Sequence, residues 1–123
     1  MHATLGTVAI VEDDAATRRS LERLLQAHNY ATASFASAEE FLASATVDSA
    51  VGLVLDIHLG GMSGIELHRR LLAAGSKLPV VFITAHDDEA MRREALAAGC
   101  VDYLQKPFDA SRLIGSLERG RKP

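Results

Sequence analysis

Short apolar runs alternate with amphipathic segments along this chain. Most of the runs are rich in β-branched residues and are apolar almost throughout, which is typical of short strands buried on both faces. The five runs are Thr7 to Val11, Ala31 to Phe35, Val51 to Leu55, Pro79 to Thr84 and Val101 to Leu104. The pattern therefore predicts a parallel sheet with helices on both of its faces.

The segments between the runs carry helix signals. The first shows apolar spacing typical of a helix at Leu21, Leu24, Leu25 and His28. Ser37 with Glu40 and Ser63 with Glu66 fit capping boxes, and Asp87 and Asp109 are placed to cap the fourth and fifth helices. Left-handed helix ends are predicted at Asn29, Gly75 and Gly99, and one apolar face of the fifth helix at Leu113, Ile114 and Leu117.

Five strands alternating with five helices predict one α/β domain over residues 1–123. The expected architecture is a three-layer α/β/α fold of the flavodoxin-like type. The natural strand order for such a five-stranded parallel sheet is 2-1-3-4-5, although the sequence alone does not fix this order.

Composition narrows the function classes. The 123 residues are 48% hydrophobic and carry a net charge of -3, which argues against direct nucleic-acid binding because that needs a concentrated basic face. No apolar run is long enough to span a membrane and no signal-peptide pattern is present, so a cytoplasmic location is expected. The single cysteine, Cys100, is expected to be a small buried apolar residue.

Polar residues follow the predicted strands at their carboxyl ends, which meet at one edge of a parallel sheet. These residues are Glu12, Asp13, Asp14, Asp56, Thr84 and Lys106. Clustered carboxylates repel one another unless a cation joins them, and Mg²⁺ prefers such hard oxygen ligands, with Mn²⁺ as a possible substitute. We expect Asp13 and Asp56 to bind the ion directly and Glu12 to act through water, whereas Asp14 fits a helix cap.

A metal-bound carboxylate can also attack phosphorus and form an aspartyl phosphate. Asp56 is the candidate nucleophile. Lys106 would supply positive charge to the transferring phosphoryl group, and Thr84 would supply a hydroxyl to one of its oxygens.

The chain resembles a bacterial two-component response-regulator receiver domain over essentially its whole length, and in particular the receivers of LuxR/FixJ-type regulators. Four fragments in order carry the resemblance: AIVEDDAATRR, LVLDIHLGGMSGIEL, VVFITAH and DYLQKPF. The segment ATASFASAEEFLASA also resembles receivers that precede helix-turn-helix DNA-binding domains. A C-terminal DNA-binding output domain beyond this sequence is therefore plausible.

The resemblance implies that Asp56 accepts a phosphoryl group from a sensor histidine kinase or a histidine phosphotransfer protein. It assigns Mg²⁺ to Glu12, Asp13, Asp56 and a backbone carbonyl at Ile57 or His58. It also assigns phosphoryl contacts to Thr84, Ala85 and Lys106, switching to Thr84 and Tyr103, and a cis peptide bond to Lys106-Pro107.

The implied output surface comprises the fourth helix, the strand at 101–104 and the fifth helix, and could form a homodimer on phosphorylation. Arg18 and Arg19, on the polar side of the first helix, are candidates for docking the phosphodonor. His58 and His86 are expected to flank the phosphoryl site, where they either tune dephosphorylation or are ordinary loop residues. The domain would be regulatory, with at most self-phosphotransfer and slow autodephosphorylation.

Two positions depart from the family pattern, because Glu12 stands where aspartate is commoner and Gly60 where proline is usual. Two other functions stay open. A haloacid-dehalogenase-type phosphatase also uses an aspartate nucleophile, but it needs a second aspartate two residues further on, where this chain has His58. A pseudo-receiver would bind partners without phosphorylation. A flavodoxin-like electron carrier is disfavoured by the acidic residues after the first strand, and a P-loop enzyme by the absence of its motif.

Overall fold

Five parallel strands form the centre of the computed structural model, which describes residues 4–122. Their order is β2-β1-β3-β4-β5, the one expected for a flavodoxin-like sheet although the sequence alone does not fix it. The strands are β1 (Thr7–Val11), β2 (Ala31–Phe35), β3 (Gly52–Asp56), β4 (Val80–Thr84) and β5 (Asp102–Gln105). The first two match the predicted ranges, and the other three begin one residue later than predicted.

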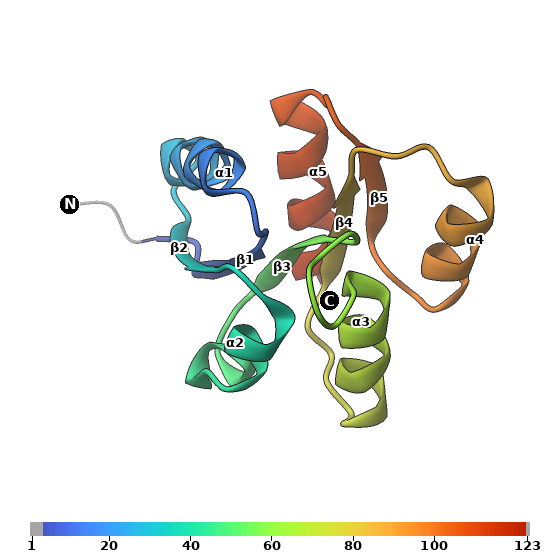
Figure 1. Cartoon of the computed structure of the whole chain (residues 1–123). Helices are drawn as coiled ribbons and strands as arrows, with labels where there is room; N and C mark the ends of the chain where they lie inside the picture. The colour runs from blue at the N-terminus through green and yellow to red at the C-terminus, as the bar shows by residue number, and fades with distance from the viewer. Residues whose placement is uncertain (1–3, 123) are drawn as a thin grey trace.

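Five α-helices connect and cover the strands (Figure 1). They are α1 (Ala15–Ala27), α2 (Ala38–Leu42), α3 (Gly64–Ala73), α4 (Glu89–Ala97) and α5 (Ala110–Arg121). A short 3₁₀ helix, η1 (Ala45–Asp48), follows α2 and was not predicted. The predicted flavodoxin-like α/β/α architecture is confirmed.

The sheet separates two apolar layers because successive side chains of a strand point to opposite faces. Val8 and Ile10 of β1 pack in the layer with α1 and α5, whereas Ala9 and Val11 pack in the layer with α2, α3 and α4. Leu113, Ile114 and Leu117 form the buried face of α5, as predicted. Cys100 is buried as expected, and burial raises the pKa of its thiol to about 11.

Most predicted helix ends are confirmed. Ser37 accepts the Glu40 N–H and Ser63 accepts the Glu66 N–H. Positive φ angles occur at Asn29, Gly75 and Gly99. No helix of residues 4–122 is both long and apolar enough to cross a membrane.

Two details were wrong, and a third is confirmed only in its position. The cap of α4 is Asp88, whose carboxylate accepts the Met91 N–H at 3.0 Å, because the helix begins one residue later than Asp87 allows. Asp109 occupies the cap position of α5 but makes no side-chain cap bond. His28 is exposed beyond the end of α1 instead of lying on its apolar face, which consists of Leu21 and Leu25 with Leu24 partly buried.

Candidate functional site

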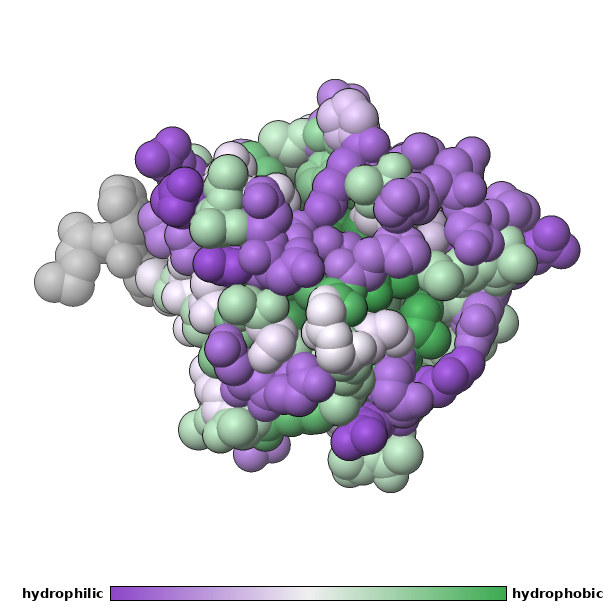
Figure 2. Space-filling view, viewed as in Figure 1, coloured by the Kyte–Doolittle hydropathy of each residue, from purple (hydrophilic) through white to green (hydrophobic). Residues whose placement is uncertain are grey.

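The predicted site residues meet where the carboxyl ends of four neighbouring strands lie together. Glu12 and Asp13 directly follow β1, Asp56 is the last residue of β3, and Thr84 is the last residue of β4. Lys106 follows β5. Since β1, β3, β4 and β5 are consecutive in the sheet, residues up to 94 positions apart in sequence come into contact. Figure 2 shows the surface in the orientation of Figure 1, with apolar atoms visible in a hollow among mostly polar residues.

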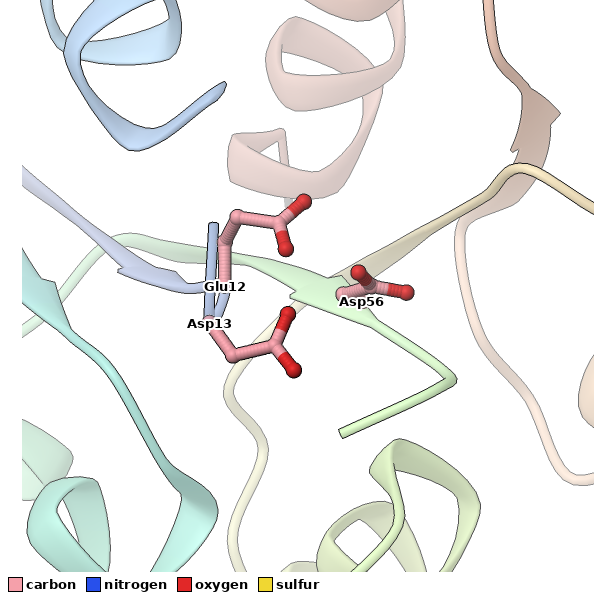
Figure 3. A group of neighbouring side chains, drawn as sticks. All are labelled: Glu12, Asp13 and Asp56. Carbon is pink, nitrogen blue, oxygen red and sulfur yellow. The ribbon is translucent and has the colours of Figure 1, made fainter. Parts of the chain in front are cut away.

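Three carboxylates converge at this edge. Glu12, Asp13 and Asp56 each offer an oxygen, and these oxygens all lie within 4.8 Å of one another. Figure 3 shows the three side chains next to one another at the ends of β1 and β3. Glu12 is 1% exposed and Asp56 is 5% exposed, whereas Asp13 is open to solvent. The arrangement suits a hard divalent cation, because such ions prefer carboxylate oxygens and a partly open site leaves room for water.

Lys106 balances part of this negative charge. Its Nζ donates to Glu12 Oε1 at 2.6 Å and to Asp56 Oδ2 at 3.4 Å. Burial disfavours the charged form of this lysine, but the Glu12 hydrogen bond and the charges of Asp56 and Glu12 outweigh burial, so the pKa of Lys106 is raised above its usual value. The Lys106-Pro107 peptide bond is cis, as the resemblance implies.

Backbone amides also bind the two buried carboxylates. The His58 N–H donates to Asp56 Oδ1 at 3.0 Å, and the Asp14 N–H donates to Glu12 Oε2 at 3.2 Å. Asp14 itself caps α1 through the Thr17 N–H at 2.9 Å, as expected for a residue outside the acidic cluster. Asp56 is therefore a buried carboxylate with an amide donor and a nearby cation.

The Gly64 backbone lies directly against the end of β3. A Cβ atom at this position would lie 2.3 Å from the carbonyl oxygen of Asp56. Only glycine therefore allows α3 to begin so close to Asp56.

Thr84 is fully buried, and its hydroxyl accepts the His86 N–H at 3.1 Å. The Thr84 carbonyl accepts the Lys106 N–H at 2.7 Å, so the backbone joins the threonine to the lysine loop. Ala85 is exposed at the start of the following loop.

His58 and His86 lie on the two loops that leave β3 and β4, and both are exposed. Their rings meet edge to face with centroids 4.6 Å apart. Sequence spacing places each histidine two residues after a site residue, but it does not reveal that the two rings touch.

Tyr103 is 3% exposed and packs near Phe82, with ring centroids 6.3 Å apart. Its hydroxyl is buried and has no hydrogen-bond partner among residues 4–122. Phe82 also contacts the buried His68 of α3 edge to face, at 5.4 Å between centroids. His68 was not a sequence candidate, since its helical position looks ordinary.

Two further contacts reach the site and were missed. Arg18, predicted on the polar side of α1 with Arg19, is half-buried, and its guanidinium donates to the Glu12 carbonyl at 2.8 Å. Arg19 is exposed as expected. Glu39 of α2 accepts the Met62 N–H at 3.0 Å, which joins α2 to the loop after Asp56. No local sequence signal predicts either contact.

Comparisons with known proteins find related sequences. The family model described as the response regulator receiver domain matches residues 8–118. The transcriptional regulatory protein FixJ of Rhizobium meliloti is 40% identical over 113 residues, covering 92% of this chain and 55% of the relative. Nodulation protein W of Bradyrhizobium diazoefficiens is 38% identical over 124 residues, covering 98% of this chain and 55% of the relative.

Solved structures are similar as well. The crystal structure titled FixJ-N superposes with a TM-score of 0.85 at 36% identity, covering 98% of this chain and 95% of that one. A response regulator receiver protein from Burkholderia phymatum gives a TM-score of 0.80 at 39% identity, with 94% of each chain covered. The chain spans about half the length of most of the curated relatives it matches, and a quarter of the regulatory protein DctD of Rhizobium meliloti.

Proposed function

Because the chain belongs to the response regulator receiver domain family of two-component systems, we propose that it accepts a phosphoryl group on Asp56 and changes its surface in response. One observation carries the proposal: the buried Asp56 carboxylate lies beside two other carboxylates and 3.4 Å from the Lys106 ammonium. This set pairs a nucleophile with groups that can hold a metal ion and a phosphate.

The acidic residues suit Mg²⁺, or Mn²⁺ as a substitute. Asp13 and Asp56 would bind the ion directly, Glu12 through water, and the backbone carbonyl of His58 would add a ligand. When bound, the ion would offset the negative charge that builds up on the phosphoryl oxygens. The fit rests on the chemistry of three converging carboxylates.

The side chains would act on the phosphoryl group as follows. An Asp56 carboxylate oxygen forms a bond to phosphorus while the bond between phosphorus and the donor's histidine nitrogen breaks, and its electron pair stays on that nitrogen. Lys106 stabilises the charge on the phosphoryl oxygens. The Thr84 hydroxyl and the Ala85 amide donate to the same oxygens.

The conformational change would follow from the hydrogen bond between the Thr84 hydroxyl and the phosphoryl group. In the structure the Thr84 hydroxyl accepts the His86 N–H, and a phosphoryl oxygen that accepted the hydroxyl proton would draw the hydroxyl toward Asp56 and away from His86. Movement of the loop after β4 would change the space around Tyr103 and the surface of α4, β5 and α5. That surface is the proposed site of homodimer formation or target binding.

The phosphodonor would be a sensor histidine kinase or a histidine phosphotransfer protein that docks near α1, where Arg19 is exposed. Relatives about twice as long are named as transcriptional regulators, which supports a DNA-binding output domain in the whole protein. The domain would act in the cytoplasm and be regulatory, with His58 and His86 limiting water access to the aspartyl phosphate.

Incubation of the protein with magnesium and acetyl phosphate tests the proposal. Wild type should gain one phosphoryl group by intact mass and Asp56→Asn none. Sustained turnover of many phosphate esters would favour the dehalogenase-type phosphatase instead, although His58 stands where that enzyme needs its second aspartate. No modification at all would favour a pseudo-receiver.

A further inference from the structure

The Glu39 carboxylate spans the gap between α2 and the loop that follows Asp56. It accepts the Met62 N–H at 3.0 Å across 23 positions of sequence. It also lies against Gly61, where an added Cβ atom would come within 2.8 Å of Glu39 Oε2. Gly61 has a φ of 78°, so a side chain there would be strained, whereas the exposed Glu39 carboxylate ends a flexible side chain that can shift away. The Glu39 carboxylate therefore contacts the loop backbone at both Gly61 and Met62.

Few other hydrogen bonds hold the loop between Asp56 and α3, although the side chains of Leu59 and Met62 pack against the core. Its two ends are fixed, because the Ile57 N–H donates to the Ile83 carbonyl and the Gly64 N–H donates to the Ile57 carbonyl. The amides of residues 59–61 bind no acceptor in the part of the chain that the structure describes. Two successive glycines at 60 and 61 add conformational freedom. The Glu39 bond thus restrains the loop at Met62, just before the start of α3.

The charge state of Glu39 favours this bond. The Met62 N–H and the amide of Glu39 itself hold the pKa of its carboxyl below the usual value, so the carboxylate is ionised at neutral pH. Hydrogen bonds from an amide to an ionised acceptor are stronger than neutral ones.

We propose that Glu39 is a positioning residue, which holds the loop after Asp56 in the conformation that metal and phosphoryl binding require. The inference rests on the proposed function, because the loop carries the His58 carbonyl and lies beside the acceptor. Under this proposal α2, which lies across the loop from α4, also influences the reactivity of Asp56 (Figure 1).

The chain offers a matched control. Glu40, the next residue, caps the start of α2 by accepting the Ala36 N–H at 3.1 Å and makes no hydrogen bond to the loop. Glu39→Ala removes the loop contact, whereas Glu40→Ala removes a neighbouring carboxylate of the same helix. Glu39→Gln keeps a carbonyl oxygen that can accept the Met62 N–H.

Proline at position 60 provides a rescue. Gly60 has no left-handed φ, and an added Cβ would meet nothing within 4 Å. Gly60→Pro would restrict the backbone by another route, since proline fixes φ. The double variant Glu39→Ala, Gly60→Pro should therefore recover the magnesium affinity that Glu39→Ala loses. If Glu39 only stabilised α2, proline at position 60 would not restore that affinity.

Two measurements test the proposal. Hydrogen exchange of the Met62 amide in metal-free protein reports on the restraint, and magnesium affinity with the acetyl phosphate reaction rate reports on the site. Glu39→Ala should speed the exchange and weaken magnesium binding about 10-fold, at the low end for residues that support metal ligands. Glu39→Gln should weaken magnesium binding less than Glu39→Ala does, and Glu40→Ala should match wild type. The double variant Glu39→Ala, Gly60→Pro should bind magnesium within about 2-fold of wild type.

Equal Met62 exchange and equal magnesium affinity in Glu39→Ala and Glu40→Ala would overturn the proposal. Weakened affinity that Gly60→Pro does not restore would also contradict it. If wild type gained no phosphoryl group, the proposed function would fail, but Met62 exchange would still decide whether Glu39 restrains the loop.

Discussion

Lys106 lies closer to Glu12 than to Asp56, with Nζ 2.6 Å from Glu12 Oε1 and 3.4 Å from Asp56 Oδ2. Glu12 is nearly inaccessible to solvent, and Lys106 is the cation that lies against its carboxylate. In the metal-free protein the lysine therefore compensates both buried carboxylates.

Replacing Lys106 should change both the stability of the protein and its affinity for magnesium. Lys106→Met leaves the buried Glu12 carboxylate without its cation and should cost roughly 2–3 kcal/mol of unfolding free energy, below the range for fully buried pairs because Lys106 is partly exposed. Loss of a nearby positive charge should also strengthen magnesium binding about tenfold. Urea unfolding in the presence of a metal chelator measures the change in stability, and a magnesium titration measures the change in affinity.

The exposed Lys77 provides the control, since Lys77→Met should change neither property. Equal unfolding curves for the two variants would contradict the account. In wild type, the raised pKa of Lys106 means that its contribution to stability is full below pH 10.5 and is lost as pH rises through the folded-state pKa.

His68 should make stability depend on pH in the opposite direction. Burial lowers the pKa of this histidine below 6.5, so the unfolded chain binds its proton more readily than the folded protein does. Stability should therefore be full above pH 6.5 and fall as pH drops below that value, with a slope of at most about 1.4 kcal/mol per pH unit.

Urea unfolding between about pH 7 and pH 5 checks this effect, because the histidine of the unfolded chain takes up its proton there, before most carboxylates do. His68→Leu should flatten the dependence, whereas His28→Gln, at an exposed histidine, should retain the wild-type slope. A slope unchanged in His68→Leu would show that the effect arises elsewhere.

Tyr103→Phe should leave the stability of the unphosphorylated protein within about 0.5 kcal/mol of wild type, since the buried hydroxyl loses no hydrogen bond. Tyr30→Phe is the matched comparison, because the Tyr30 hydroxyl accepts from Arg121 Nε at 3.0 Å. That variant should lose about 1 kcal/mol. Equal losses in the two variants, measured by urea midpoint, would mean that Tyr103 has a partner.

Much of this structure follows from local sequence signals. The strand pattern and the end of each strand predict which residues share an edge, and the similarity to receiver domains is confirmed by the family match. Helix limits such as Ser37, Ser63 and Asn29 are equally local, because each is set by a hydrogen bond or φ angle within a few residues.

Contacts between elements were not predictable in the same way. The carboxylate of Glu39, the guanidinium of Arg18 and the paired rings of His58 and His86 all reach partners through side-chain conformations that only tertiary packing selects. The shift of the α4 cap from Asp87 to Asp88 has a simpler cause, since adjacent aspartates offer the same signal.

Locating the phosphoryl group tests the central claim most directly. After reaction with acetyl phosphate and magnesium, borohydride reduction converts an aspartyl phosphate to homoserine, which peptide mass spectrometry can assign to one position. The account predicts homoserine at position 56 alone and none in Asp56→Asn. Homoserine at position 13, or wild-type protein that carries no reducible phosphate, would contradict it.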